Sequence, residues 1–466
     1  MSNTPLHFKT ITEIAKLIES KELSPVELTS VMLERIQQHD SRFKSYATVM
    51  SEQAMAAAQN AEKEISAGEY RGPLHGVPIG VKDLCFTKGI PTMGGAKVLK
   101  NHVPDYDCTV VQRLKSAGAI LLGKLNLTEG AMGGYNPEFD IPINPWNPDR
   151  WTGSSSSGSG VATAAGLCSG SIGSDTGGSI RFPSAACGIV GIKPTYGRVS
   201  RSGVLALAES MDHVGPMTRS VADAGIMLEA IAGYDTNDPT SLSDPVPAML
   251  EGIGKSIEGV RIGFDENYAT KDVDTELAMA VSDGVKLLQD LGAEIVDAAL
   301  PDMDEYVLAW PTICSAESVA AHAATYPSKR DNYGPWFQDW LDMGADVTGA
   351  GYAEANKLRS ACTGHLRQIF QDIDVLVCPS MAAPPHKVSP ELLYGPKETR
   401  PTWFQRFTAP FDYNGAPTLS VPCGFNSEEL PLSIQFVGKH LSEPLLCQVG
   451  HAYESTTEWH NRHPDV

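Results

Sequence analysis

Short apolar segments of strand length alternate with helix-like segments along most of this chain. Residues 119–123, for example, read as a buried strand directly after an expected helix at 109–117. Strands that alternate with helices are typical of α/β folds. A length of 466 residues allows one large domain or two ordinary ones, and no clean linker divides the chain. We therefore predict an α/β fold: a single large domain over residues 1–466 with a central mixed β-sheet flanked by helices.

The same alternation predicts most of the remaining elements. One helix start is explicit, because Ser24 suits the N-cap, Pro25 suits the first turn and Glu27 stands where a capping box needs an acid. Other expected helices lie at 51–65, 161–167 and 275–291, and expected strands at 76–84, 171–174, 189–192, 260–263, 293–296, 374–378, 418–421 and 432–437.

The net charge and the cysteine content indicate which partners and which cellular compartment to expect. The 56 acidic and 36 basic residues give a net charge of −20. Such a surface repels phosphate backbones and anionic lipids, so we expect no nucleic-acid and no membrane partner. Residues 1–10 contain no apolar core of signal-peptide length, and no apolar run of about 18 residues occurs, so we expect neither a signal peptide nor a membrane span. The nine cysteines are odd in number and form no C-x-x-C pair, which favours a cytoplasmic location over a disulfide framework or a zinc site.

The most unusual segment is rich in glycine and serine. Residues 153–160 read Gly-Ser-Ser-Ser-Ser-Gly-Ser-Gly, and residues 173–181 form a second such cluster. A flexible linker is one interpretation, but an apolar helix follows the first cluster directly. A phosphate-binding loop is another, but Ser159 and Gly160 stand where Lys and Ser/Thr are required.

The third interpretation is a serine hydrolase site without histidine. Ser179 lies where an expected strand turns into a helix, and consecutive backbone N–H groups of Thr176, Gly177 and Gly178 could hold an oxyanion. The chain has neither the G-x-S-x-G motif of α/β-hydrolases nor the H-E-x-x-H motif of zinc proteases. The serine therefore needs another base, because a serine hydroxyl is a weak nucleophile unless a neighbour takes its proton.

Lys82 is the candidate base. It ends an apolar strand, so its stem is expected to be buried, and a desolvated lysine has a lowered pKa and can be neutral near pH 7. The alternative is an ordinary lysine paired with Asp83. Two neighbours of Ser179 have expected structural roles: Asp175 and Arg181 would pair and brace the loop. His213 is expected to be a core histidine rather than a reacting group.

Taken together, these motifs resemble the amidase-signature family. The resemblance covers most of the chain in ordered pieces, at residues 76–83, 122–133, 153–179, 191–200, 210–217 and 415–423. It implies a signature core at about 70–220. It also implies that excursions at about 235–260 and 300–410 set the substrate pocket. We leave open whether Trp310, Trp336, Trp340 and Trp403 line that pocket or only fill the core.

The resemblance also implies roles for individual residues. Ser179 matches the family's nucleophile, Lys82 its base, and Ser155 the serine that bridges them and whose peptide bond is cis in the family. The oxyanion hole would be the backbone of Thr176, Gly177 and Gly178. The substrate would lie against the backbone of three further residues, Met132, Gly133 and Gly134.

Two departures from the family pattern bear on function. Ser154 stands where the family often has glycine, so Ser154 and Ser156 are alternatives for the bridging serine. The glutamine-using amidotransferase members of the family hold glutamine with an acid, where this chain has Gln405, although Arg359 matches a family arginine. The missing acid argues against glutamine as the substrate.

We therefore predict an amidohydrolase that cleaves a small-molecule carboxylic amide through an acyl-serine intermediate. The alternatives are an esterase, a urea- or carbamate-type hydrolase, a protein like the A component of glutamyl-tRNA amidotransferase, or an inactive binding protein. The resemblance implies no metal and no other cofactor, and a homodimer is possible.

Overall fold

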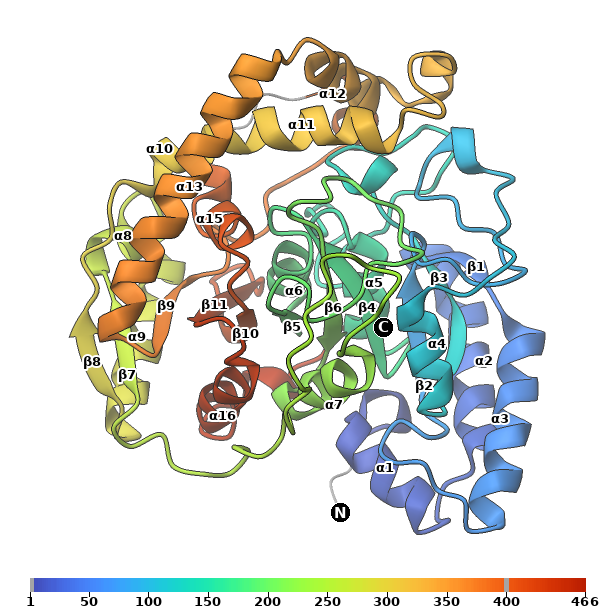
Figure 1. The fold of residues 1–466 in the computed structure, drawn as a ribbon. Helices are drawn as coiled ribbons and strands as arrows, with labels where there is room; N and C mark the ends of the chain where they lie inside the picture. Colours follow the sequence, from blue (N-terminus) through green and yellow to red (C-terminus); the bar gives the residue numbers. More distant parts are fainter. Residues whose placement is uncertain (1–3, 398–401) are drawn as a thin grey trace.

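One mixed β-sheet runs through the computed structural model, which describes residues 4–397 and 402–466 (Figure 1). Eleven strands of this described part follow the order β1-β3-β2-β4-β6-β5-β10-β11-β9-β7-β8. The pairs β2–β3, β2–β4, β7–β8 and β7–β9 are parallel, and the other neighbours are antiparallel. The strands are β1 (Tyr46–Val49), β2 (Pro78–Lys82), β3 (Ile120–Leu125), β4 (Gly170–Asp175), β5 (Val190–Lys193), β6 (His213–Thr218), β7 (Arg261–Phe264), β8 (Glu294–Asp297), β9 (Val375–Pro379), β10 (Thr418–Phe425) and β11 (Pro431–Gly438).

Helices surround this sheet, as predicted. In Figure 1, α2 and α3 flank the β1 edge, α9 lies near the β8 edge, and α11, α12 and α13 form a group above the strands. The helices are α1 (Ile11–Glu19), α2 (Pro25–Phe43), α3 (Ser51–Ser66), α4 (Thr109–Ser116), α5 (Ser157–Ala164), α6 (Arg181–Cys187), α7 (Val221–Ile231), α8 (Glu266–Thr270), α9 (Thr275–Asp290), α10 (Met303–Val307), α11 (Ala309–Ala321), α12 (Pro335–Ala345), α13 (Gly349–Asp372), α14 (Pro390–Tyr394), α15 (Ala409–Tyr413) and α16 (Glu443–Glu454).

The predicted helix start at Ser24 is correct, but its capping box is not. The Ser24 side chain accepts hydrogen bonds from the backbone N–H groups of Val26 and Glu27. The Ser24 hydroxyl donates to Glu62 of α3, and the return bond from the Glu27 side chain is not formed. Ser24 therefore caps the first turn of its own helix and also links that helix to α3.

The sequence did not predict strand β6, and this strand joins the two halves of the sheet. It lies between β4 and β5 and is antiparallel to both. Gly215 and Pro216 interrupt its apolar pattern, so its strand character comes from pairing rather than from local composition. The Cβ of any larger residue at position 215 would come within 2.1 Å of the Ile192 carbonyl oxygen, which explains the glycine.

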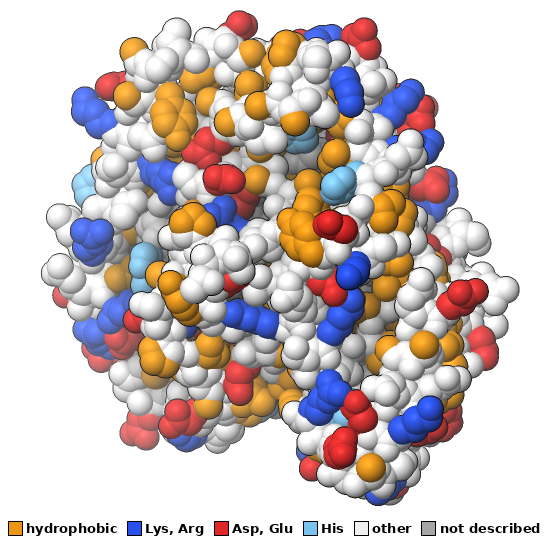
Figure 2. Space-filling view, turned by 45° about the vertical axis from the view of Figure 1, so that its right-hand side comes forward, with side chains coloured by type: hydrophobic (Ala, Val, Ile, Leu, Met, Phe, Trp, Pro, Cys, Tyr) orange, Lys and Arg blue, Asp and Glu red, His pale blue; other side chains and the backbone are white. Residues whose placement is uncertain are grey.

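The fold places two strand ends beside one another. Strands β2 and β4 are parallel neighbours, and their carboxyl ends carry Lys82 and Asp175. All residues of both strands are buried. Among the described helices, none is both long enough and apolar enough to cross a membrane. The face drawn in Figure 2 mixes acidic and basic side chains without a continuous basic area.

Candidate active site

Lys82 is fully buried at the end of β2, and its ammonium group contacts three serine hydroxyls. The Nζ atom lies 2.7 Å from Ser155 Oγ, 2.8 Å from Ser156 Oγ and 2.8 Å from Ser174 Oγ. Burial lowers the pKa of Lys82 to about 7, although the nearby carboxylates of Asp175 and Asp212 act in the opposite direction. The alternative pairing of Lys82 with Asp83 is not formed, because Asp83 lies 3.1 Å from Lys124 instead.

The glycine- and serine-rich segment forms the loop before α5. The peptide bond between Ser154 and Ser155 is cis. Gly153 has a φ of 79°, and a Cβ at that position would lie 2.4 Å from the backbone nitrogen of Pro183. This close approach requires glycine, so the segment is a tightly packed loop and not a linker.

Ser156 is held more rigidly than Ser155. Its hydroxyl accepts a hydrogen bond from the Ser174 N–H at 3.2 Å and donates to the Ser174 carbonyl oxygen at 3.1 Å. With Lys82 as a third partner, the hydroxyl proton of Ser156 is already directed to a carbonyl group. Ser155 Oγ has only the Lys82 contact among the hydrogen bonds of the described residues, which leaves its proton available.

Ser179 lies between β4 and α6 and is half-buried in otherwise buried surroundings. Its carbonyl oxygen accepts a hydrogen bond from the Ser156 N–H at 3.3 Å, which joins the loop of Ser179 to the loop of Ser155. Two loops that are distant in the sequence thus meet beside Lys82.

A buried ion cluster shapes the loop of Ser179. The Asp175 carboxylate accepts hydrogen bonds from the N–H groups of Gly178 at 2.7 Å and Ile180 at 2.9 Å. Arg181 lies 2.7 Å from Asp175 and 2.7 Å from Asp412, so the predicted bracing pair is confirmed. Burial opposes the charge of Asp175, but Arg181 outweighs it and holds the pKa of that carboxyl below its usual range.

Some backbone N–H groups of the Ser179 loop are already hydrogen-bonded, and others are free to bind an oxyanion. The Gly178 N–H is occupied by Asp175. The N–H groups of Thr176, Gly177 and Ser179 have no partner within the described part of the chain. The Thr176 carbonyl oxygen accepts a hydrogen bond from Trp310 Nε1 at 2.9 Å, so Thr176 ties the loop to α11.

Ser179 opens onto a cavity of about 240 Å³, which we call the aromatic cavity. Three tryptophans left open by the sequence, Trp310, Trp336 and Trp340, line it, whereas the Trp403 side chain lies outside the described residues. The full lining is Ala131, Met132, Gly133, Ser154, Gly177, Ser179, Phe182, Leu207, Val307, Leu308, Trp310, Pro311, Trp336, Trp340, Lys397, Phe404 and Gln405.

The indole rings of Trp310 and Trp336 pack directly against glycine residues. A Cβ at Gly133 or Gly134 would lie 2.4 Å from atoms of Trp336, and a Cβ at Gly177 would lie 2.6 Å from Trp310. Of the three predicted substrate-side residues, Met132 and Gly133 line the cavity. Gly134 is not part of the lining, but it packs against Trp336, which is.

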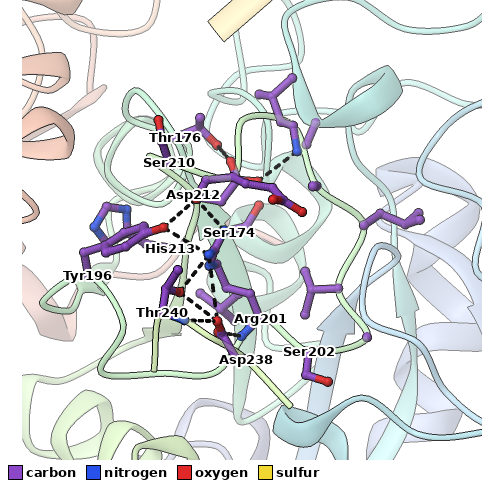
Figure 3. Close-up of a pocket in the computed structure, with 18 of the residues that line it drawn as sticks. Ser174, Thr176, Tyr196, Arg201, Ser202, Ser210, Asp212, His213, Asp238 and Thr240 are labelled. Atoms are coloured by element: carbon purple, nitrogen blue, oxygen red, sulfur yellow. Dashed lines mark hydrogen bonds and ion pairs between the residues drawn. The ribbon is translucent and has the colours of Figure 1, made fainter. Parts of the chain in front are cut away.

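A second, polar cavity of about 540 Å³ lies on the other side of this loop (Figure 3). Ser174 and Thr176 line it, and the Thr176 hydroxyl donates to Asp212 at 2.6 Å. In Figure 3, Thr176 and Asp212 lie at one end and Arg201 and Asp238 at the other. The sequence analysis did not predict this cavity, although the family-like segments at 191–200 and 210–217 supply several of its lining residues.

His213 is a core histidine, as expected, although its ring reaches the edge of the polar cavity. Its Nδ1 lies 2.6 Å from the Met211 carbonyl oxygen and its Nε2 lies 3.2 Å from Lys193 Nζ. Burial holds the pKa of His213 well below its usual value. Arg359 lies outside both linings, because it donates to Ser210 and to the Tyr413 carbonyl oxygen.

The described residues contain no group of three or more His, Cys, Asp and Glu side chains that could hold a metal ion.

Comparisons with known proteins identify the family of this chain. The sequence model of the family described as Amidase matches residues 27–447. The chain is 45% identical to the putative amidase AmiD of Mycobacterium bovis, over 98% of this chain and 96% of the relative. It is 38% identical to the A component of the glutamyl-tRNA(Gln) amidotransferase from Geobacter sp. strain M21, over 97% of this chain and 98% of the relative.

Solved structures show the same fold. A bacterial aryl acylamidase of the amidase-signature enzymes superposes with a TM-score of 0.88 at 26% identity, over 98% of this chain and 99% of the other. Sequence and structure thus agree over nearly the whole length. The chain belongs to the amidase family and is an amidohydrolase of the amidase-signature type.

Proposed function

We propose that this amidohydrolase cleaves carboxylic amides through an acyl-Ser179 intermediate, with Lys82 as the base and Ser155 as the bridge between them. The observation that carries the proposal is the 2.7 Å contact between Lys82 Nζ and Ser155 Oγ in a fully buried setting. A buried amine with a pKa of about 7 is neutral often enough at physiological pH to take a proton.

The hydrogen bonds favour Ser155 over its neighbours as the bridge. Ser156 directs its proton to the Ser174 carbonyl oxygen, so it serves to orient Lys82. Ser154 lines the aromatic cavity but does not contact Lys82. Ser155, which lies between Ser154 and Ser156 in the sequence, contacts Lys82 and has no other side-chain hydrogen bond among the described residues.

The reaction follows from this chain of hydroxyls. Lys82 takes the Ser155 proton while Ser155 takes the Ser179 proton, and Ser179 Oγ attacks the amide carbonyl carbon. The proton returns through Ser155 to the leaving nitrogen, the C–N bond breaks and the acyl group stays on Ser179. A water molecule then attacks by the reverse route, which releases the acid and restores the Ser179 hydroxyl.

The backbone supplies the stabilisation of the tetrahedral intermediate. We assign the N–H groups of Gly177 and Ser179 as the oxyanion donors, since the Gly178 N–H is bonded to Asp175. In other hydrolases one such donor contributes about 3 kcal/mol. The Thr176 carbonyl oxygen fixes the loop against Trp310, and the Thr176 N–H is a third candidate donor because it has no partner among the described residues.

The aromatic cavity favours a flat, apolar acyl group. A cavity of about 150 Å³ suffices for benzene in an engineered protein, so about 240 Å³ admits one ring with a short chain. The relative with an aryl acylamidase activity in its name fits this class. Gln405 and Lys397 are polar residues of the lining, and no described residue there is acidic, which argues against glutamine and its ammonium group.

Two broader expectations belong to this proposal. The nine cysteines are all buried thiols, which supports a cytoplasmic location. A homodimer remains a prediction. An esterase activity would use the same acyl-enzyme and is expected as a side reaction.

The experiment that tests the proposal is labelling with an aryl sulfonyl fluoride, followed by mass spectrometry of the peptides. We expect an adduct on Ser179 that is lost in Lys82→Ala. An unlabelled Ser179 in protein that also fails to turn over a panel of aryl amides would contradict the proposal.

A further inference from the structure

Lys397 is the charged residue of the aromatic cavity, and the proposed mechanism does not use it. The residue is half-buried, and no other described residue of the lining carries a charge. Its Nζ atom lies 5.9 Å from the centroid of the Trp340 ring and 3.8 Å from Met343 Sδ. These neighbours are a ring and a thioether, and within the described part of the chain no carboxylate forms an ion pair with this ammonium group.

The segment that carries Lys397 is fixed to α12. The Lys397 backbone N–H donates to the Asp339 carboxylate at 3.2 Å. Asp339 is exposed and does not line the aromatic cavity. It therefore positions the backbone of Lys397, while the ammonium group lies beside Trp340.

A row of indole rings joins the Ser179 loop to Lys397. A Cβ at Gly177 would lie 2.6 Å from Trp310. Trp310 and Trp340 lie on α11 and α12, the helices above the strands in Figure 1, and their ring centroids are 5.7 Å apart. Because Lys397 lies next to the second ring, the nucleophile and the ammonium group stand at opposite ends of one aromatic wall.

The indole N–H groups of this wall are already bonded. Trp310 Nε1 donates to the Thr176 carbonyl oxygen at 2.9 Å, and Trp340 Nε1 donates to Ser318 Oγ at 3.0 Å. A ligand that lies along the wall therefore meets the apolar surface of two rings, and the ammonium group of Lys397 beyond them.

We propose that Lys397 binds a carboxylate at the far end of the acyl group, so that the substrates are monoamides of dicarboxylic acids with a flat linker, such as a benzene ring, between the two carbonyl groups. The inference rests on the proposed function and names its substrate class. A hydrogen bond from an ammonium group to a carboxylate is stronger than one between neutral groups, and the linker packs against the indole rings. Hydrolysis with one water molecule gives the free dicarboxylic acid and the amine.

The test compares kcat/KM for two anilides with the same leaving group, 4-carboxybenzanilide and 4-methylbenzanilide. The ratio of the two values in the wild type, divided by the same ratio in Lys397→Met, cancels the intrinsic reactivity of each amide. We expect this quotient to be about ten. Lys397→Arg keeps the charge and is expected to stay within about threefold of the wild-type ratio. A quotient near one would overturn the inference.

Two controls separate direct contact from long-range attraction. Lys357 is exposed on α13, lies 3.3 Å from Glu354 and is outside the cavity lining, so Lys357→Met should leave the wild-type ratio unchanged. Oxanilate carries its carboxylate directly on the scissile carbonyl, which places that charge at Ser179 and away from Lys397. A loss for oxanilate in Lys397→Met as large as the loss for 4-carboxybenzanilide would contradict a contact at the far end of the cavity.

A binding measurement tests the inference without turnover. Calorimetry on Ser179→Ala compares terephthalate with 4-methylbenzoate, and we expect terephthalate to bind about tenfold more tightly. This advantage should disappear in Ser179→Ala/Lys397→Met, and equal affinities in Ser179→Ala would overturn the inference. Failure of the proposed function is distinct, because mass spectrometry would then find no acyl-Ser179 from either anilide.

Discussion

The Nζ atom of Lys82 lies 2.7 Å from Ser155 Oγ and 2.8 Å from Ser156 Oγ, yet the two serines differ in what their protons can do. The Ser156 proton is directed to a carbonyl oxygen, and the Ser155 proton is not. Two serines at nearly the same distance from the base therefore differ in whether their protons can be transferred.

Alanine substitutions should distinguish the proposed bridging role of Ser155 from the role of Ser156 in orienting Lys82. We expect Ser155→Ala to lower kcat by about a thousandfold, and Ser156→Ala by about tenfold through a less ordered Lys82. Single-turnover acylation rates with an aryl amide provide the measurement. A larger loss in Ser156→Ala than in Ser155→Ala would reverse the assignment.

The pH dependence should report Lys82. Burial lowers its pKa to about 7, and only the neutral amine can accept a proton. We expect kcat/KM to rise with pH and to level off above an apparent pKa near that value. A profile that still rises near the free lysine value of about 10.4 would rule out Lys82 as the base.

Asp212→Asn should move this profile. The negative charge of Asp212 favours protonated Lys82, so its removal is expected to shift the midpoint of kcat/KM to lower pH. The amide keeps an oxygen that can accept from the Thr176 hydroxyl, as the carboxylate does now. A shift to higher pH would show that Asp212 acts on the profile in another way.

The contact between Gly134 and Trp336 should be sensitive to one methyl group. A Cβ at Gly134 would lie 2.4 Å from Trp336 Cγ, so Gly134→Ala has to displace the indole at a cost of about 1–3 kcal/mol. We expect a higher KM for aryl amides. In the double variant Gly134→Ala/Trp336→Ala the two effects should not add, and strict additivity would show that the methyl group acts elsewhere.

Removal of Arg181 should destabilise the protein. Arg181→Met leaves Asp175 and Asp412 buried without their shared partner, and breaking such a buried pair costs about 3–5 kcal/mol. Urea unfolding measures the loss. Arg181→Lys keeps one positive charge and is the matched control, expected to lose less.

The fold class could be predicted from local sequence, and the residues that the proposed mechanism uses also lie in recognisable sequence motifs. The pattern of apolar residues that predicts a strand or a helix lies within one short segment. The strand that contains Lys82 and the helix that begins after Ser24 were therefore predictable. Strand β6 was not, because Gly215 and Pro216 become strand residues only by pairing with β4 and β5. The family resemblance placed Lys82, Ser155 and Ser179 in one site, and local motifs sufficed for that.

The surroundings of these residues depend on long-range packing and could not be predicted in this way. Trp310 and Trp336 come from helices far along the chain and rest on Gly177 and Gly133, and no local pattern encodes such a contact. The hydrogen bond from Gly178 to Asp175 and the polar cavity beside Ser174 likewise arise in the folded chain. Local sequence sets backbone conformation and residue chemistry, whereas the shape and charge of a cavity are sums over segments that meet only when the chain folds.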